Sequence, residues 1–466
     1  MSRRTLTADQ QKLAEQLVED LREQSEEVLR EVAEILSSVP DEKIFGDTEF
    51  TVRDRILKLV ATAFTARLAQ KKNGYAGSTI ECPCGRSATF RDYRERNPLG
   101  LGGKVVCRRA YYCCAVCGKG GCPWDQQVGL NDANLTPAVE RLTALTGAIA
   151  DSFEKGRELL GEAAGIDLSE STTQRVTEAV GRRIAQTLGE KKTFGPAQVW
   201  SWNRDAFNRT VAYVGLDATG VRQQGPYGAK ADGRMAYVGA IFNPLPDRER
   251  VFEGLPPPGT RMQARYLSGL YPLAEMGPLL RQQGAQVGMD QAEIWIALTD
   301  GGSGLEAFMT TNFPRVAAVI LDFWHAAEYL AKLAKVLHAS DEEKATAQTR
   351  QWSRILKEEG GTTMIAVLEA WDWPERVPGL KTTRDDVLQY LRNQETRMDY
   401  PTYEANGWYI GSGVVESACK TVVGQRLKGS GMRWSEKGAH ELCHVRALYR
   451  SERTQWKAFW NRDTRA

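Results

Sequence analysis

The sequence lacks the apolar segments that export or membrane insertion would need. Its 466 residues contain no uninterrupted apolar run of ~18 residues, the length that a membrane span requires. The opening MSRRTLTADQQ has two arginines but no apolar stretch after them, unlike an export signal. A hydrophobic content of 42% and a charged content of 26% are ordinary for a soluble globular protein. We therefore expect a cytoplasmic protein of several domains, with no membrane partner.

Cysteine is scarce outside one short segment. Seven of the nine cysteines lie between Cys82 and Cys122, and in a reducing compartment such clustering favours a metal over disulfides. Two short turns each carry two thiols followed by a glycine, in the sequences CPCG and CAVCG. Brought together, the two turns would form a tetrahedral sulfur site that suits zinc. We predict a structural, zinc-ribbon-like module over residues 76–130, with these ligands: Cys82, Cys84, Cys114 and Cys117.

Two alternatives stay open for this module. The first turn has one residue between its cysteines rather than two, which leaves Cys82 or Cys84 uncertain as a ligand. Three other cysteines could substitute: Cys107, Cys113 and Cys122. The cysteines could also be reduced and buried as small hydrophobic residues.

Helical periodicity dominates the segments on either side of the cysteines. Residues 7–37 show one apolar face and a capping box from Thr7 to Gln10, and a second helix is expected over 52–70, so 1–75 forms an N-terminal helical region. The long helix should pack on its own domain, a coiled-coil dimer contact being the alternative.

A second helical region spans 131–195. It is expected to contain helices over 138–149 and 153–164, and a third that is capped near Ser169 or Ser171. This order is typical of a helix-turn-helix unit, in which Arg175 and Arg182 on the last helix would contact DNA. An inert three-helix bundle is the alternative.

From about residue 196 the pattern changes to that of an α/β domain. Buried strands are expected over 210–216, 235–242, 294–298 and 316–321, a further strand over 250–252, a loop over 255–259 and a helix over 262–283. Three of the strands end at an aspartate where the chain passes into a loop: Asp217, Asp300 and Asp322. In open α/β sheets, sites gather at such edges. Residues 331–405 are helical, and their tryptophans are expected in a core, with stacking on distorted DNA as the minority interpretation.

Three carboxylates have the chemistry of a divalent metal site. Asp217, Asp300 and Glu416 supply the hard oxygen ligands that Mg²⁺ or Mn²⁺ prefers, and two such ions can polarise both reacting oxygens of a phosphodiester. Each acid also has an ordinary explanation: the end of a strand, a turn or the first turn of a helix. Asp322 and His325 stand three residues apart at a helix start and can face the same side. His325 would contact the reacting phosphate, or be a satisfied interior histidine.

Basic residues concentrate after Glu416, in the segment 406–466. From residue 417 to the end there are 11 Lys or Arg against 4 Asp or Glu, an excess of 11 − 4 = +7 in a chain of net charge +2. We expect five of these residues to hold DNA, the basic ones through its phosphates: Lys420, Arg426, Lys428, Arg433 and Trp434.

Four motifs together resemble one enzyme family. YVGLDATG, LTDGG, ILDFWHAAEYL and GSGVVESACKTVVGQRLKGSGMRWS look like the DDE transposases of the ISKra insertion sequences, relatives of the Mutator-like group. The resemblance covers the chain from about residue 80 onward. It implies an RNase H-like catalytic core (196–330 and 406–466) that is interrupted by an all-helical insertion (331–405) and preceded by helical and zinc-ribbon-like DNA-binding modules.

The resemblance also implies an activity and partners. Asp217, Asp300 and Glu416 would be the metal-binding triad, with Asp322 and His325 as the accessory signature. The protein would bind the terminal inverted repeats of its element and join them to target DNA, as a homodimer or larger assembly associated with the nucleoid. The alternatives are a DNA-binding regulator derived from such an enzyme, and a nuclease that cuts without joining.

Overall fold

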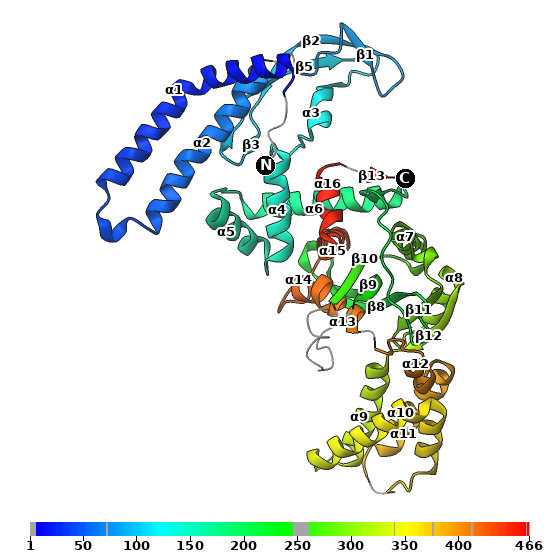
Figure 1. Ribbon diagram of the computed structural model, residues 1–466. Helices are drawn as coiled ribbons and strands as arrows, with labels where there is room; N and C mark the ends of the chain where they lie inside the picture. Colours follow the sequence, from blue (N-terminus) through cyan, green and yellow to red (C-terminus); the bar gives the residue numbers. More distant parts are fainter. Residues whose placement is uncertain are drawn as a thin grey trace. The chain divides into compact units, whose positions relative to one another are not determined.

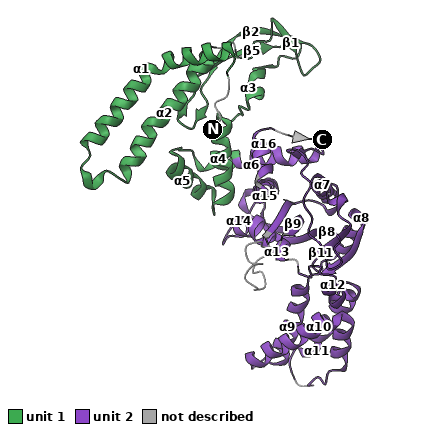
Figure 2. Ribbon diagram, viewed as in Figure 1, with its two compact units in different colours: residues 1–176 green, residues 177–466 purple. Residues whose placement is uncertain are grey.

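The computed structural model describes residues 6–70, 73–245, 261–339, 341–374, 377–411, 413–462 and 464–465. The chain is mixed α/β and divides into two compact units, residues 1–176 and 177–466 (Figure 2). The strand expected over 250–252 and the loop over 255–259 lie outside the described residues. Among the residues that are described, no helix has both the length and the apolar character needed to cross a membrane.

A helical hairpin opens the first unit (Figure 1). α1 (Ala8–Ser38) has the predicted capping box between Thr7 and Gln10, and a short 3₁₀ turn, η1 (Asp41–Lys43), precedes α2 (Asp47–Ala69). α2 begins five residues earlier than expected because Gly46 adopts a φ of +83° and its N–H donates to Glu49 at 3.0 Å. α1 packs along α2 of its own unit, as expected, with an ion pair between Glu31 and Arg55 at 3.3 Å, although none of its residues is fully buried.

The cysteine segment forms a small sheet of order β1-β2-β5-β6. β1 (Thr79–Glu81), β2 (Ser87–Arg96) and β5 (Cys107–Cys113) pair antiparallel, and β6 (Gly120–Gly121) closes the edge. β3 (Leu99–Gly100) and β4 (Gly103–Lys104) form a separate hairpin, and α3 (Pro123–Val128) follows. The module's core consists of very few side chains: Cys82, Ala88, Ala110, Tyr112 and Cys114.

Three helices follow at nearly the predicted bounds. They are α4 (Pro137–Ile149), α5 (Phe153–Ala164) and α6 (Glu170–Gly189). α4 and α5 cross closely at Gly156, where an added Cβ would lie 2.8 Å from the Thr146 carbonyl oxygen. Their apolar periodicity and the Ser152 cap, which accepts from the Lys155 N–H at 3.0 Å, explain why the sequence located them well.

The second unit is built on a five-stranded sheet of order β10-β9-β8-β11-β12. β8 (Val211–Gln224), β9 (Lys230–Leu245) and β10 (Arg261–Gly269) form an antiparallel meander, with the short turn η2 (Pro226–Gly228) between β8 and β9. β11 (Ile294–Thr299) and β12 (Val316–Leu321) run parallel to β8. The connections contain α7 (Leu273–Gln286), η4 (Met289–Gln291) and α8 (Leu305–Asn312).

Two expectations about this sheet were wrong. β8 does not stop at Asp217: it continues to Gln224, and Asp217 pairs with Val238 in mid-strand. The helix expected over 262–283 is a strand in its first part, because residues 261–269 pair along β9 and α7 starts only at Leu273. The buried Arg265 of this strand, 1% exposed, gives no apolar signal in the sequence.

Helices α9 to α12 lie between β12 and the last part of the chain, and gather at one end of the sheet (Figure 1). Their bounds are α9 (Phe323–Leu337), α10 (Glu342–Ala370), α11 (Leu380–Asn393), η5 (Glu395–Arg397) and α12 (Tyr400–Ala405). Trp352 is fully buried, with ring centroids 5.4 Å from Trp371 and 6.1 Å from Trp373. The prediction that these tryptophans build a core is confirmed.

The last segment returns to the sheet. It comprises α13 (Gly413–Ala418), the π-helix η6 (Cys419–Gly424), α14 (Gln425–Leu427), α15 (Glu436–Arg450) and α16 (Arg453–Trp460). β13 (Thr464–Arg465) pairs with β7 (Thr193–Phe194).

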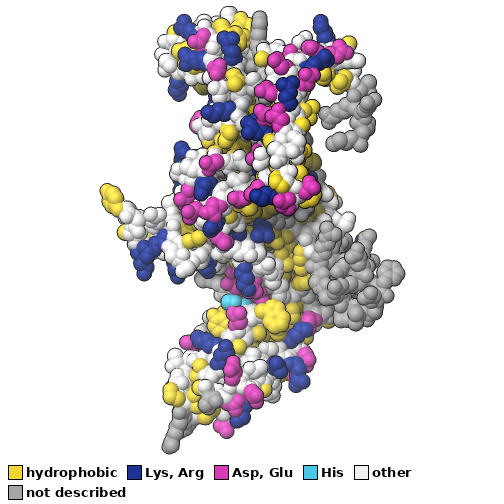
Figure 3. All heavy atoms as spheres, turned by 90° about the vertical axis from the view of Figure 1, so that its left-hand side faces the viewer, with side chains coloured by type: hydrophobic (Ala, Val, Ile, Leu, Met, Phe, Trp, Pro, Cys, Tyr) yellow, Lys and Arg dark blue, Asp and Glu magenta, His cyan; other side chains and the backbone are white. Residues whose placement is uncertain are grey.

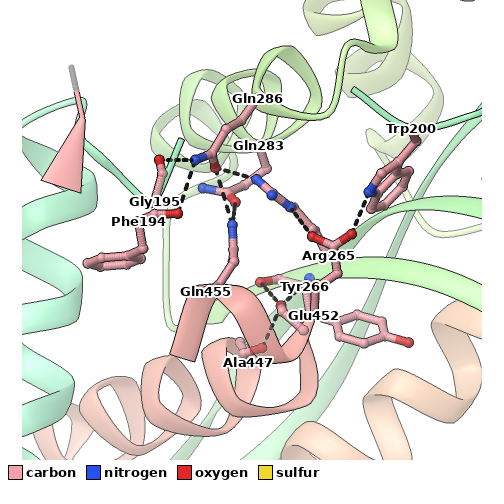
Figure 4. Close-up of polar contacts among 11 residues, drawn as sticks. Phe194, Gly195, Trp200, Arg265, Tyr266, Gln283, Gln286, Ala447, Glu452 and Gln455 are labelled. Atoms are coloured by element: carbon pink, nitrogen blue, oxygen red, sulfur yellow. Dashed lines mark hydrogen bonds and ion pairs between the residues drawn. The ribbon is translucent and has the colours of Figure 1, made fainter. Parts of the chain in front are cut away.

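A buried polar network ties this segment to β10 (Figure 4). Arg265 donates to Glu452 at 3.0 Å and also to Gln286, which in turn donates to the Phe194 carbonyl at 3.1 Å. The Trp200 indole N–H donates to the other Glu452 oxygen. The network joins segments that are far apart in the sequence. It pairs the buried guanidinium of Arg265 with the Glu452 carboxylate, which offsets the cost of burying its charge.

Candidate metal centre and acidic site

The four predicted cysteines converge. Their sulfur atoms all lie within 4.8 Å of one another, a group that could hold a metal ion and is consistent with structural zinc. Cys82 and Cys117 are 3.6 Å apart and Cys84 and Cys114 are 3.8 Å apart, so each turn contributes to both pairs. Glycines with positive φ follow each turn, Gly85 at +79° and Gly118 at +70°, a conformation that glycine adopts at low cost.

The environment of these thiols differs between the two turns. Backbone hydrogen bonds from Cys117 and Val116 lower the pKa of Cys114 to about 7. The pKa of Cys82 rises to about 12: a backbone hydrogen bond from Cys84 lowers it, but burial and the neighbouring thiols outweigh this. Because thiolates are the metal-binding form, the lowered pKa of Cys114 favours metal binding at this sulfur more than the raised pKa of Cys82 does. The possible substitutes, Cys107, Cys113 and Cys122, are not in the group.

Asp217 and Asp300 come from neighbouring parallel strands. β11 pairs with β8 so that Thr299 lies opposite Leu216, which places the two aspartates at the next position of each chain. Burial raises the pKa of Asp217, and the negative charge of Asp300 adds to this, against hydrogen bonds from Cys419 and the Ala218 N–H. Asp300 accepts a hydrogen bond from the Gly302 N–H at 2.9 Å. The two carboxylates therefore repel each other across the strands.

The segment from α13 to η6 covers the face of β8 that carries Asp217. Side chains alternate along a strand, so Gly215 and Asp217 share one face. α13 packs directly on Gly215, since a Cβ there would lie 2.3 Å from a Val415 methyl carbon. One turn further along, Cys419 at the start of the π-helix donates its hydrogen bond to Asp217. π-helical turns are uncommon and occur often at functional sites.

Glu416 lies on the same segment but is engaged elsewhere. Its carboxylate is 2.6 Å from the Lys420 ammonium, in an ion pair whose side chains are 52% and 71% exposed. In the parts of the chain that are described, the cysteine group is the only set of three or more candidate ligands within 4.8 Å of one another. Asp217, Asp300 and Glu416 thus do not form one tight cluster in this structure.

Asp322 and His325 occupy the start of α9, as predicted, in different roles. The Asp322 carboxylate accepts from the N–H groups of Trp324 at 2.7 Å and His325 at 3.3 Å, so it caps the helix. His325 is partly exposed; its charge lowers the pKa of Asp217, and its Nδ1 lies 3.9 Å from Glu328. His325 is therefore near enough to Asp217 to influence its pKa, whereas Asp322 caps its own helix.

The segment from α9 to α12, called the helical segment below, supplies two residues near this site that the sequence did not indicate. Arg397, 3% exposed, donates to the Thr299 hydroxyl, to the Val319 carbonyl at 3.2 Å and to the Asp300 carbonyl at 3.4 Å. The Tyr400 hydroxyl donates to the Leu321 carbonyl at 3.0 Å. These bonds fix the ends of β11 and β12. Neither residue belongs to a recognisable pattern, so no sequence signal could have identified them.

The predicted basic residues near β8 separate into exposed and buried ones. Lys428 is exposed and donates to the Thr219 hydroxyl at 2.8 Å, on the face of β8 that carries Asp217. Arg433 is also exposed. Arg426 is only 2% exposed and lies over the Trp434 ring at 4.9 Å, and Trp434 itself is 8% exposed. The expectation that Arg426 and Trp434 contact DNA is therefore corrected: they pack in the interior.

The arginines predicted on α6 also have protein partners. Arg175 is exposed and donates to the Ser171 carbonyl at 3.2 Å. Arg182 donates to the buried Glu441 of α15 at 2.7 Å, so part of its charge is neutralised. Acidic and basic side chains are interspersed over the face shown in Figure 3. Within the last 50 residues Arg426 and Arg446 are both 2% exposed, so part of the basic excess there lies inside the fold.

Comparison with known proteins adds no assignment. No known protein-family model matches the chain, and no curated protein matches it.

Proposed function

We propose that the protein is a DDE transposase with an RNase H-like core that helices α9 to α12 interrupt. The observation that carries the proposal is the placement of Asp217 on β8 beside Asp300, which directly follows the parallel strand β11, beneath the helix that bears Glu416. The strand order β10-β9-β8-β11-β12, with a three-stranded meander followed by two parallel strands, supports it. The four sequence motifs that resemble ISKra transposases fall at these same positions.

The aspartate pair fits a divalent cation. Neither Asp217 nor Asp300 takes part in an ion pair within the described residues, and each carboxylate's hydrogen bonds come from backbone N–H groups or the Cys419 thiol. Two unpaired carboxylates that repel one another are stabilised when a cation lies between them. Mg²⁺ and Mn²⁺ prefer such oxygen ligands, and when bound they would supply the charge that activates a water and stabilises the leaving oxygen.

The surrounding residues have complementary tasks. Glu416 would leave Lys420 to join the two aspartates, since a single exposed ion pair contributes little stability. Lys420, freed in this way, and Lys428 would hold backbone phosphates on the same face of the sheet. His325 would donate to a phosphate oxygen near Asp217. Arg397 and Tyr400 would hold the strand ends so that the carboxylates keep their spacing.

Other parts of the chain would recognise DNA. The zinc-ribbon-like module and the helices α4 to α6 would bind the ends of the element, with Arg175 at the surface. Because two DNA ends must be joined to one target, the active form would be a dimer or a larger assembly on DNA.

The test is cleavage and strand transfer on DNA that carries the sequences flanking the gene. Wild-type protein should cut and join in Mg²⁺, whereas Glu416→Gln should bind the DNA and do neither. Glu369→Gln is the matched control, because Glu369 of α10 also takes part in an exposed ion pair, with Arg392 at 2.6 Å. A wild type that binds but never cuts would favour a regulator derived from a transposase; cutting without joining would favour a nuclease.

A further inference from the structure

A tyrosine of the helical segment reaches the candidate site with its hydroxyl unused. Tyr390 of α11 stacks on Tyr329 of α9, with ring centroids 3.7 Å apart and an interplanar angle of 4°. The His325 ring is 6.3 Å from the Tyr390 ring. Within the described structure, the Tyr390 hydroxyl is buried and has no hydrogen-bond partner. Buried polar groups are nearly always hydrogen-bonded, so this exception requires an explanation.

The hydroxyl lies against the turn that carries Asp300. A Cβ added to Gly301 would lie 2.5 Å from the Tyr390 hydroxyl oxygen, so the phenol occupies the space of a side chain at that position. Burial raises the pKa of Tyr390, and the nearby Tyr329 and the negative charges of Asp300 and Asp322 add to this. The phenol is thus neutral and can act as a hydrogen-bond donor.

Of the two nearby carboxylates, Asp300 is the available acceptor. The Asp322 carboxylate is committed to the N-terminus of α9, where it accepts from Trp324 and His325. Among the described residues, the Asp300 carboxylate accepts one hydrogen bond, from the Gly302 N–H to its Oδ1. Arg397 holds the Asp300 carbonyl. Because Arg397 holds the main chain of this turn, we expect the Asp300 side chain, and not the backbone, to move when a ligand binds.

We propose that Tyr390 is a positioning residue for Asp300: when the Asp300 carboxylate turns from the Gly302 N–H to bind a divalent cation, the Tyr390 hydroxyl donates a hydrogen bond to the carboxylate. This inference rests on the proposed metal site at Asp217 and Asp300. Residues that hydrogen-bond to metal ligands orient them, and losing one typically weakens metal binding by about 10- to 100-fold. The helical segment would then be part of the metal site and not only a scaffold.

The test is Mn²⁺ binding to the zinc-loaded full chain, measured by electron paramagnetic resonance of free Mn²⁺, without DNA or turnover. Tyr390→Phe keeps the ring stack and removes only the hydroxyl, and should raise the Kd for Mn²⁺ by about 10-fold. The matched control is Tyr329→Phe, which removes the other hydroxyl of the same stack and should leave the Kd within about 2-fold, because that hydroxyl bonds to no ligand.

A double mutant tests whether Tyr390 affects Mn²⁺ binding through Asp300. Tyr390→Phe should cause no additional loss in an Asp300→Asn background if it acts through Asp300. Unchanged Mn²⁺ affinity in Tyr390→Phe, or an equal loss in Tyr329→Phe, would overturn the inference while leaving the proposed function standing. A wild type that binds no Mn²⁺ beyond the level of Asp300→Asn would overturn both. Thermal melting of each variant shows that it is folded.

Discussion

Replacing Cys114 by serine should cost the protein its zinc and the fold of the cysteine module. Cys114 is fully buried and Cys82 is 4% exposed, so two of the five buried core residues of the module are themselves candidate metal ligands. Of the remaining three, only Tyr112 is large, and burying one such side chain contributes about 1.5–3 kcal/mol. A structural zinc contributes about 10–16 kcal/mol of apparent folding free energy. A zinc ion bound by the four cysteines would therefore dominate the stability of this module.

The assay combines metal content with local stability. Wild type should carry one zinc per chain, and Cys114→Ser should carry almost none, with fast hydrogen exchange over residues 79–121. Cys113→Ser is the control, because Cys113 is adjacent in sequence but outside the sulfur group. Stoichiometric zinc in Cys114→Ser, or zinc loss in Cys113→Ser, would refute the assignment of ligands.

Three further predictions concern the second unit. Arg265→Gln, which leaves the largely buried Glu452 carboxylate without its cationic partner, should destabilise the unit by about 3 kcal/mol, whereas the exposed Arg234→Gln should change its stability by under about 0.5 kcal/mol in urea titrations. Trp352→Ala should lower the stability of the helical segment by about 3–5 kcal/mol, seen as earlier loss of its near-ultraviolet signal, and a cost below about 1 kcal/mol would contradict the packing. Burial, and to a lesser degree His440, hold the pKa of His444 well below its usual value. Below about pH 6.5 only the unfolded chain takes up the proton, so the free energy of unfolding should fall by up to about 1.4 kcal/mol per pH unit. Above about pH 6.5 the histidine is neutral in both states and does not change the stability. His444→Gln should flatten the fall in melting temperature between pH 7.5 and 5, and a His338→Gln control should not.

Local patterns explain the parts of the fold that the sequence predicted well. The helices α4, α5 and α6 have clear apolar periodicity; α4 begins with a proline, and α5 and α6 have serine caps. β11 and β12 are short, nearly continuous apolar runs. The cysteine group was predictable because paired thiols on two glycine-ended turns have few other uses. In each case the information lies within about a dozen neighbouring residues.

Long-range pairing explains what the sequence could not give. Residues 261–269 look like part of a helix because Arg265 and Arg261 interrupt any strand alternation, and the partner that buries Arg265 is Glu452, far along the chain. From the sequence, Arg426 is expected at the surface, whereas in the structure it packs on the Trp434 ring. Nothing around Tyr390 marks it as a neighbour of Asp300, since only the packing of α11 on α9 brings them together.

Glu416 illustrates which part of the candidate site could be predicted from the sequence and which could not. Sequence order placed it on a helix start, and the structure has it in the first turn of α13, over the face of β8 that carries Asp217. Its ion pair with Lys420 could not be foreseen as a competitor for the aspartates, although the spacing of four residues permits it. A helix terminus is thus predictable, whereas the choice between two partners of one carboxylate depends on what else is bound.

The most direct test of the proposed catalytic centre is Mg²⁺-dependent DNA cleavage by the Asp217→Asn variant. The control is Asp232→Asn, which changes an exposed aspartate on β9 of the same sheet. Asp217→Asn should bind the DNA with wild-type affinity and lose cleavage by at least about 10³-fold, while Asp232→Asn cuts normally. Equal cleavage by the two variants would contradict the assignment of the aspartate pair as the catalytic centre.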